Sequence, residues 1–174
     1  MKYLIFTVLL IAELNGKTIK EYETEKKVDQ LLLLVQKRLS LMHEVAKIKW
    51  NKDLAIEDKA REETILNTLS QKINPVDKSW IIAFFKAQIE AAKQMQKADF
   101  SCWKREGIET IDTTLSLNVA LREYIDRLND EMLDLLSKVS QEDLKKTYLN
   151  KPISIRDADS IPQDVWNTAI DPIR

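Results

Sequence analysis

The chain has 174 residues, of which 44% are apolar and 32% charged, and this length and composition suit one domain with a buried core. Its 27 basic residues face 28 acidic ones, so overall charge gives no reason to expect a nucleic acid or an anionic membrane as a partner. With one cysteine and one histidine, we expect no internal disulfide, no His-rich metal site and no Ser/His or Cys/His nucleophile pair.

The N-terminus differs from the rest of the chain. Lys2 precedes an apolar run, Tyr3–Ala12, that is shorter than the roughly 20 residues needed to span a bilayer. A positive residue followed by such a run is typical of a secretory signal, and a buried N-terminal strand or helix is the alternative. We therefore expect residues 1–16 to be a signal peptide and residues 17–174 to form a single exported domain, periplasmic or secreted, with no membrane association after cleavage.

The remaining chain is predicted to be all-α, because helix formers dominate it and Gly107 and Pro75 are its only glycine and proline before Pro152. The expected helices are Tyr22–Asn51, Glu57–Ile73, Val76–Arg105, Glu109–Val139 and a short one over Gln141–Leu149. The tail from Asn150, which contains three prolines, is expected to be irregular, with one helical turn around Gln163–Ala169.

Two cations lie on the apolar face of the first predicted helix. At about 100° per residue, Arg38 is at the centre of the apolar stripe, and Lys49, eleven residues later, returns to within about 20° of it. An unpaired buried cation is costly, so each needs an anionic partner. That partner is either a carboxylate elsewhere in the core or a ligand with two carboxylates, unless the side chains extend out to solvent. The stripe consists of Leu31, Leu34, Val35, Leu41, Met42 and Val45.

The second predicted helix places acidic residues on its apolar face. Glu62 projects near the middle of that face, Asp58 lies close to it and Arg61 lies at its edge. The structural alternative is that Asp58 caps the helix while Arg61 and Glu62 pair at the surface.

The third and fourth predicted helices add two more polar residues. Gln96 lies in a seam of aromatic and aliphatic residues, where a buried amide must find hydrogen-bond partners. Arg122 flanks the apolar stripe of the fourth helix, and on its own it would be interpreted as a solvated arginine. Taken together, the four helices predict a buried, cation-rich pocket between helices.

These residues resemble the all-α chorismate mutases. The likeness implies their type II helical fold, with three core active-site helices, a long fourth helix and short C-terminal helices. The apparent signal peptide and the long fourth helix are similar to the exported subclass. Three segments carry the resemblance: Leu34–Leu39 with Val45–Trp50, the Asp-x-x-Arg-Glu pattern within Ile56–Glu62, and Phe84–Gln96.

The resemblance implies a role for each polar residue. Arg38 and Arg122 would grip the two carboxylates of chorismate, and in the exported subclass the helix-four arginine replaces one that shorter enzymes take from the neighbouring protomer. Lys49 and Gln96 would contact the ether oxygen, and both are expected to be catalytic together with Arg38.

Three further positions complete the implied substrate site. Glu62 would hold the ring hydroxyl, while Arg61 and the backbone near Asp58 would close the pocket. Where relatives often carry Ser, Thr or Asn, this chain has Ala92, so one hydrogen bond to a carboxylate is expected to be missing.

The implied activity is the rearrangement of chorismate to prephenate, with no metal and no cofactor, by a homodimer whose pockets are each made within one chain. Two alternatives remain open. The first is an isochorismate-pyruvate lyase, which shares this fold, and the second is a secreted helical interaction protein without activity.

Overall fold

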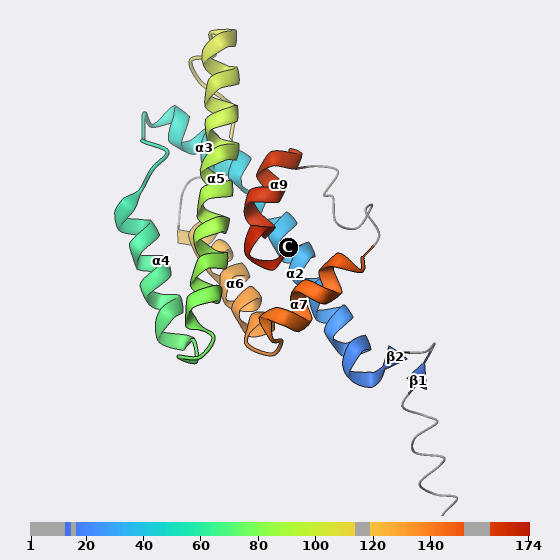
Figure 1. The fold of residues 1–174 in the computed structure, drawn as a ribbon. Helices are drawn as coiled ribbons and strands as arrows, with labels where there is room; N and C mark the ends of the chain where they lie inside the picture. Colours follow the sequence, from blue (N-terminus) through green and yellow to red (C-terminus); the bar gives the residue numbers. More distant parts are fainter. Residues whose placement is uncertain (1–12, 15–16, 114–118, 152–160) are drawn as a thin grey trace, which may run out of the picture.

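The structure is a computed structural model that describes residues 13–14, 17–113, 119–151 and 161–174, and the predicted signal segment 1–16 therefore lies almost wholly outside the described residues. Helices dominate the described part, which confirms the predicted all-α class (Figure 1). Two residue pairs, β1 (Glu13–Leu14) and β2 (Lys17–Thr18), form a minimal antiparallel ladder. The helices are α2 (Ile19–Ser40), α3 (Met42–Asn51), α4 (Lys59–Lys72), α5 (Lys78–Glu106), α6 (Val119–Leu136), α7 (Gln141–Leu149), α9 (Gln163–Ile170) and the 3-10 helix η1 (Asp171–Ile173).

The first predicted helix, Tyr22–Asn51, is two helices that follow one another through Leu41. It begins earlier than predicted because Thr18 and Glu21 form a capping box, in which each side chain accepts a hydrogen bond from the other's backbone N–H. Leu41 keeps a right-handed helical backbone, and its N–H donates to the Lys37 carbonyl at 3.3 Å. The division into α2 and α3 is therefore slight, and the expected face is maintained across it.

The fourth helix was predicted to begin at Glu109, and this is wrong. Residues 108–113 are not helical, and α6 begins at Val119. The Asn51 side chain holds this segment, because its amide donates to the Ile111 carbonyl at 2.7 Å and its carbonyl accepts from the Ile111 N–H at 2.9 Å. A backbone engaged in this way cannot also form helical hydrogen bonds.

A helical turn was predicted around Gln163–Ala169, and the structure has a longer, regular helix there, α9, which packs against α5 (Figure 1). Trp166 and Ala169 are buried, as the apolar face of an amphipathic helix would be. The flanking prolines bound the helix rather than break it, since Pro162 is its N-cap and Pro172 lies in η1.

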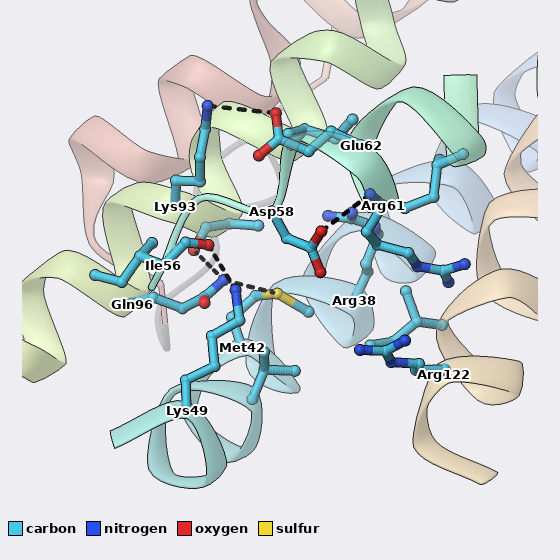
Figure 2. Close-up of a pocket in the computed structure, with 15 residues that line it drawn as sticks. Arg38, Met42, Lys49, Ile56, Asp58, Arg61, Glu62, Lys93, Gln96 and Arg122 are labelled. Atoms are coloured by element: carbon cyan, nitrogen blue, oxygen red, sulfur yellow. Dashed lines mark hydrogen bonds and ion pairs between the residues drawn. The ribbon is translucent and has the colours of Figure 1, made fainter. Parts of the chain in front are cut away.

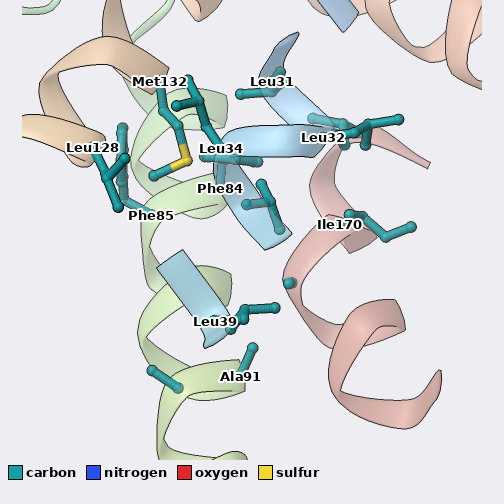
Figure 3. Close-up of a cluster of buried hydrophobic side chains, with 14 of the residues drawn as sticks. Leu31, Leu32, Leu34, Leu39, Phe84, Phe85, Ala91, Leu128, Met132 and Ile170 are labelled. Atoms are coloured by element: carbon teal, nitrogen blue, oxygen red, sulfur yellow. The ribbon is translucent and has the colours of Figure 1, made fainter. Parts of the chain in front are cut away.

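A single apolar core lies where α2, α5, α6 and α9 meet (Figure 3). Because such interiors are close-packed, the helix backbones that carry polar side chains are held in fixed positions. None of the described helices has both the length and the apolar character needed to cross a bilayer. The core residues labelled in the figure are Leu31, Leu32, Leu34, Leu39, Phe84, Phe85, Ala91, Leu128, Met132 and Ile170.

An aromatic cluster joins α3 to the C-terminal end of α5. The ring of Trp50 packs edge-on against Phe100 and Trp103, with ring centroids 5.0 and 5.7 Å away. Its indole N–H donates to the Ile108 carbonyl at 3.2 Å. Gly107 ends α5 in the left-handed conformation, with φ of 68°, so the chain turns back at this point.

Candidate active site

A pocket lies between α2, α3, α4, α5 and α6, and all eight predicted site residues line it (Figure 2). Counted out to its open mouth, the space is about 650 Å³. The eight residues are Arg38, Lys49, Asp58, Arg61, Glu62, Ala92, Gln96 and Arg122.

Arg38 on α2 is the most deeply placed cation of the pocket, with 3% of its surface exposed. Its Nε donates to Asn129 Oδ1 at 3.0 Å and its Nη1 to the Gln88 carbonyl at 2.9 Å, and both acceptors are neutral. Burial lowers the pKa of Arg38 to about 10; the Asp126 carboxylate opposes this shift and the Arg61 cation adds to it. The guanidinium stays charged at neutral pH, but no carboxylate among the described residues pairs with it directly.

Lys49 on α3 is half-buried, and its Nζ donates to the Ile56 carbonyl at 2.5 Å. The Lys49 pKa is lowered, mainly by burial of the ammonium group and to a smaller extent by the Arg122 cation. The Asp58 and Glu62 carboxylates act in the opposite direction. One carbonyl from the loop before α4 thus orients an ammonium group that carries two more N–H donors.

Gln96 on α5 is buried, and its amide group is only partly hydrogen-bonded. Its Nε2 donates to the Ala92 carbonyl at 3.1 Å and approaches Met42 Sδ at 3.8 Å, which is a weak acceptor. Its Oε1 has no hydrogen-bond partner among the described residues. Ala92 lies one turn earlier on α5, and its methyl side chain has no hydrogen-bond donor. The amide therefore has unused hydrogen-bonding capacity inside the pocket.

Helix α4 contributes its first turn. Asp58 is the N-cap, and its Oδ1 accepts from the Arg61 N–H at 3.0 Å, as in the structural alternative considered for that residue. Arg61 and Glu62 do not pair with each other. The Arg61 Nη2 contacts Asp126 Oδ1 on α6 at 2.6 Å, and Glu62 Oε2 is 3.6 Å from the Lys93 Nζ on α5.

Arg122 enters from α6, on the side of the pocket opposite Gln96 (Figure 2). Its side chain is exposed, as the sequence pattern indicated, yet it lines the pocket. Within the described ranges it has no ion pair or hydrogen bond.

Three residues that support the site were not singled out from the sequence: Gln88, Lys93 and Asn129. Asn129 lies four residues after Ile125, inside the apolar stripe of α6, and a buried polar residue there is the same signal that identified Arg38. Gln88 lies on the corresponding apolar face of α5. The sequence could not predict that its backbone carbonyl accepts a hydrogen bond from Arg38, because that contact depends on how α5 packs against α2.

The pocket carries more positive than negative charge. Five basic residues line it and two acidic ones do. Arg61 and Lys93 each have a carboxylate within 4.0 Å, whereas Arg38, Lys49 and Arg122 have none among the described residues. Cations without a carboxylate partner favour an anionic ligand, and two of these three are arginines, whose planar fork suits carboxylates. In the part of the chain that the structure describes, no group of three or more His, Cys, Asp or Glu side chains could hold a metal.

The fold and the pocket define an all-helical protein with a cation-lined site for a small anion. Residues 26–97 match the family model described as chorismate mutase type II, so this part of the chain is similar to that family.

Named relatives agree with this similarity. The chain is 30% identical over 126 residues to the secreted chorismate mutase of Mycobacterium tuberculosis, and the aligned region spans 71% of this chain and 62% of that protein. The structure of chorismate mutase from Burkholderia thailandensis superposes with a TM-score of 0.67 and 26% identity, covering 85% of this chain and 99% of that one. The secreted chorismate mutase from Yersinia pestis shares the fold, with a TM-score of 0.62 and 22% identity over 83% of this chain and 94% of that one.

Proposed function

We propose that this protein converts chorismate to prephenate. The observation that carries the proposal is the set of three cations, Arg38, Lys49 and Arg122, around one pocket that also contains the buried amide of Gln96. None of the three has a carboxylate partner in the described part of the chain. Chorismate is a dianion, and its rearrangement is unimolecular. It needs no nucleophile and no proton shuttle. The enzyme has to fold the substrate into a reactive chair and stabilise the negative charge that grows on the ether oxygen.

The two arginines bind the two carboxylates in this proposal. Arg38 is already oriented by two hydrogen bonds, so its remaining N–H groups meet a carboxylate with little loss of side-chain entropy. Arg122 faces it from α6 and contacts the second carboxylate. Binding energy at both ends holds the substrate in the compact conformation that reacts.

Lys49 and Gln96 act at the breaking ether bond. The Lys49 ammonium keeps two N–H groups beyond the one that Ile56 occupies, and the Gln96 amide can exchange its weak contact with Met42 Sδ for a hydrogen bond to the ether oxygen. Both donors are fixed before the reaction begins, so charge can develop on the oxygen without reorganisation of the site. Preorganised donors of this kind are worth several kcal/mol, and removing one typically costs about 10²–10³ in rate.

The residues of α4 position the rest of the substrate. Glu62 accepts a hydrogen bond from the ring hydroxyl, while Lys93 lies 3.6 Å behind it. Arg61 and the capped first turn at Asp58 close the pocket. Ala92 offers no hydroxyl, so we expect carboxylate binding to depend more on the arginines here than in relatives with Ser or Thr.

The direct test is to incubate the purified protein with chorismate and to follow loss of its absorbance and appearance of prephenate. Prephenate formation supports the proposal. Release of pyruvate from isochorismate, without prephenate formation, would identify a lyase instead. No turnover of either compound would favour an interaction protein that has kept only the scaffold.

Export and dimerisation belong to the same proposal. The names of the mycobacterial and Yersinia relatives as secreted proteins, together with Lys2 and the Tyr3–Ala12 run, support export. N-terminal sequencing of protein recovered from outside the cytoplasm tests this, because a start near Lys17 is expected. The homodimer is tested by light scattering of the mature protein in solution.

A further inference from the structure

Asn129 on α6 is buried, with 2% of its surface exposed, and it lies behind the pocket rather than in its lining. Its Oδ1 accepts the Arg38 Nε at 3.0 Å. Its Nδ2 is buried and has no hydrogen-bond partner within the described residues. An orphaned buried amide N–H₂ costs stability, so an asparagine is a poor choice here if packing alone decides the residue.

The contact fixes how the guanidinium is turned. A guanidinium has five N–H donors in a rigid plane. Asn129 takes the Nε donor and the Gln88 carbonyl takes one from Nη1. The plane is thereby held from two helices, α6 and α5, and the three remaining donors are left for a ligand in the pocket. Arg38 has no freedom to rotate away from that orientation without breaking both bonds.

The contact also leaves the charge of Arg38 uncancelled. A carboxylate in place of the amide would form a buried ion pair with Arg38 and offset the positive charge that a ligand anion requires. One turn earlier on the same helix, Asp126 is a carboxylate, and it contacts Arg61 at 2.6 Å, whereas no carboxylate of the described chain lies within 4.0 Å of Arg38. Helix α6 thus gives an anionic partner to Arg61 and a neutral one to Arg38.

We infer that Asn129 is a positioning residue, which aims Arg38 at a substrate carboxylate while keeping its charge available to that carboxylate. The inference rests on the proposed function and extends it, because it assigns to a residue outside the pocket both the orientation and the net charge of the deepest anion-binding group. It also explains why a residue with an orphaned N–H₂ group stands in the core.

The test compares Asn129→Asp with Asn67→Asp, the same change at an exposed position on α4. We expect the Asn129→Asp variant to fold with a melting temperature no lower than wild type and to raise KM for chorismate by about tenfold or more, with a smaller change in kcat, since Arg38 binds the carboxylate in the ground state as well as the transition state. Asn67→Asp should leave both constants unchanged. A KM within twofold of wild type in folded Asn129→Asp overturns the inference, as does an equal rise in both variants.

A second variant, Asn129→Ala, separates orientation from charge. It removes the acceptor without adding a charge, so we expect kcat to fall by about tenfold while KM rises less than in Asn129→Asp. If Asn129→Asp does not fold, unchanged kcat and KM in folded Asn129→Ala overturn the inference. A purely structural asparagine would lower the melting temperature of the variants and leave kcat and KM unaltered. Failure of the proposed function is distinct, since wild type and Asn67→Asp would then also lack turnover.

Discussion

The two arginines proposed to bind the substrate carboxylates are held in different ways. Arg38 is almost fully buried, and two hydrogen bonds from different helices fix its plane. Arg122 is exposed and has no partner among the described residues. An arginine fixed in advance loses little freedom when a ligand arrives, whereas an exposed one must be ordered during binding. We therefore expect the Arg38 side to determine the geometry of the bound substrate and the Arg122 side to adapt to it.

The most severe test of this difference is Arg38→Ala. We expect it to lower kcat/KM by at least about 10²-fold, equivalent to about 2.7 kcal/mol, because an oriented, desolvated charge is lost. Steady-state kinetics measure the loss, circular dichroism verifies folding, and Lys37→Ala, which removes the neighbouring exposed cation of α2, is the matched control. Near-normal activity in folded Arg38→Ala would remove this residue from the site.

The buried side of the pocket is also tested through Gln96. An amide donates a hydrogen bond at any ordinary pH, but a glutamate must be protonated to donate one. We expect the wild-type kcat/KM to be nearly flat from about pH 5 to 8, and Gln96→Glu to keep activity at acid pH but lose about tenfold or more toward pH 8. The measurement is a pair of pH–rate profiles at matched ionic strength. Superimposable profiles would mean that Gln96 does not touch the ether oxygen.

Arg122→Ala tests the adaptable side and should be milder. We expect a loss of about tenfold in kcat/KM, mainly through KM, that becomes smaller at high salt because an exposed charge is screened. Arg127→Ala is the matched control, since Arg127 is also exposed on α6 but lies over the Tyr124 ring. A loss as large as that of Arg38→Ala, insensitive to salt, would contradict the proposed difference between the two arginines.

For Lys49 we predict an effect on the alkaline limb of the pH–rate profile, which should change in shape rather than in height. Because burial lowers the Lys49 pKa below its ordinary 10.5, the free enzyme loses this proton at a lower pH than an exposed lysine would. Activity needs the charged form, so kcat/KM should begin to fall below pH 10.5. Because burial also lowers the pKa of Arg38 to about 10, Lys49→Arg should displace that limb rather than abolish it, whereas Lys47→Arg should leave it unchanged. An alkaline limb at the same position in all three proteins would show that Lys49 does not contribute to it.

The last test, which mixes two variants, is expected to show no recovery of activity. Both arginines line one pocket within one chain, so mixing Arg38→Ala protomers with Arg122→Ala protomers should restore no activity. The assay is turnover after the two variants are denatured and refolded together, with a wild-type and variant mixture as the positive control. Substantial recovery would show that the pocket is shared between protomers.

Helical periodicity was sufficient to predict which polar residues line the buried half of the pocket. Arg38, Lys49 and Gln96 each interrupt an apolar stripe, and regular helices convert that spacing into a shared face. Arg122 could not be placed in this way, because it flanks its stripe and only the packing of α6 against α2 and α4 brings it to the pocket.

The errors in the predicted fold have the same origin. The residues after Gly107 have no helix breaker of their own, and what prevents a helix is a side chain from elsewhere, Asn51, that binds their backbone. In the tail, the prolines were weighed as breakers, although their positions at the ends of α9 allow the helix between them. Long-range contacts decided both cases, and local propensity does not contain them.

The aromatic cluster at the top of α5 gives the molecule an intrinsic optical reporter. Trp50 directly follows Lys49, whose ammonium points into the pocket, and its indole packs against Phe100 and Trp103. Occupation of the pocket that shifts α3 by a fraction of an ångström would alter the surroundings of this indole. Tryptophan emission should therefore follow ligand binding without an added dye, and replacing Trp103 by Phe would leave Trp50 as the main emitter in that cluster.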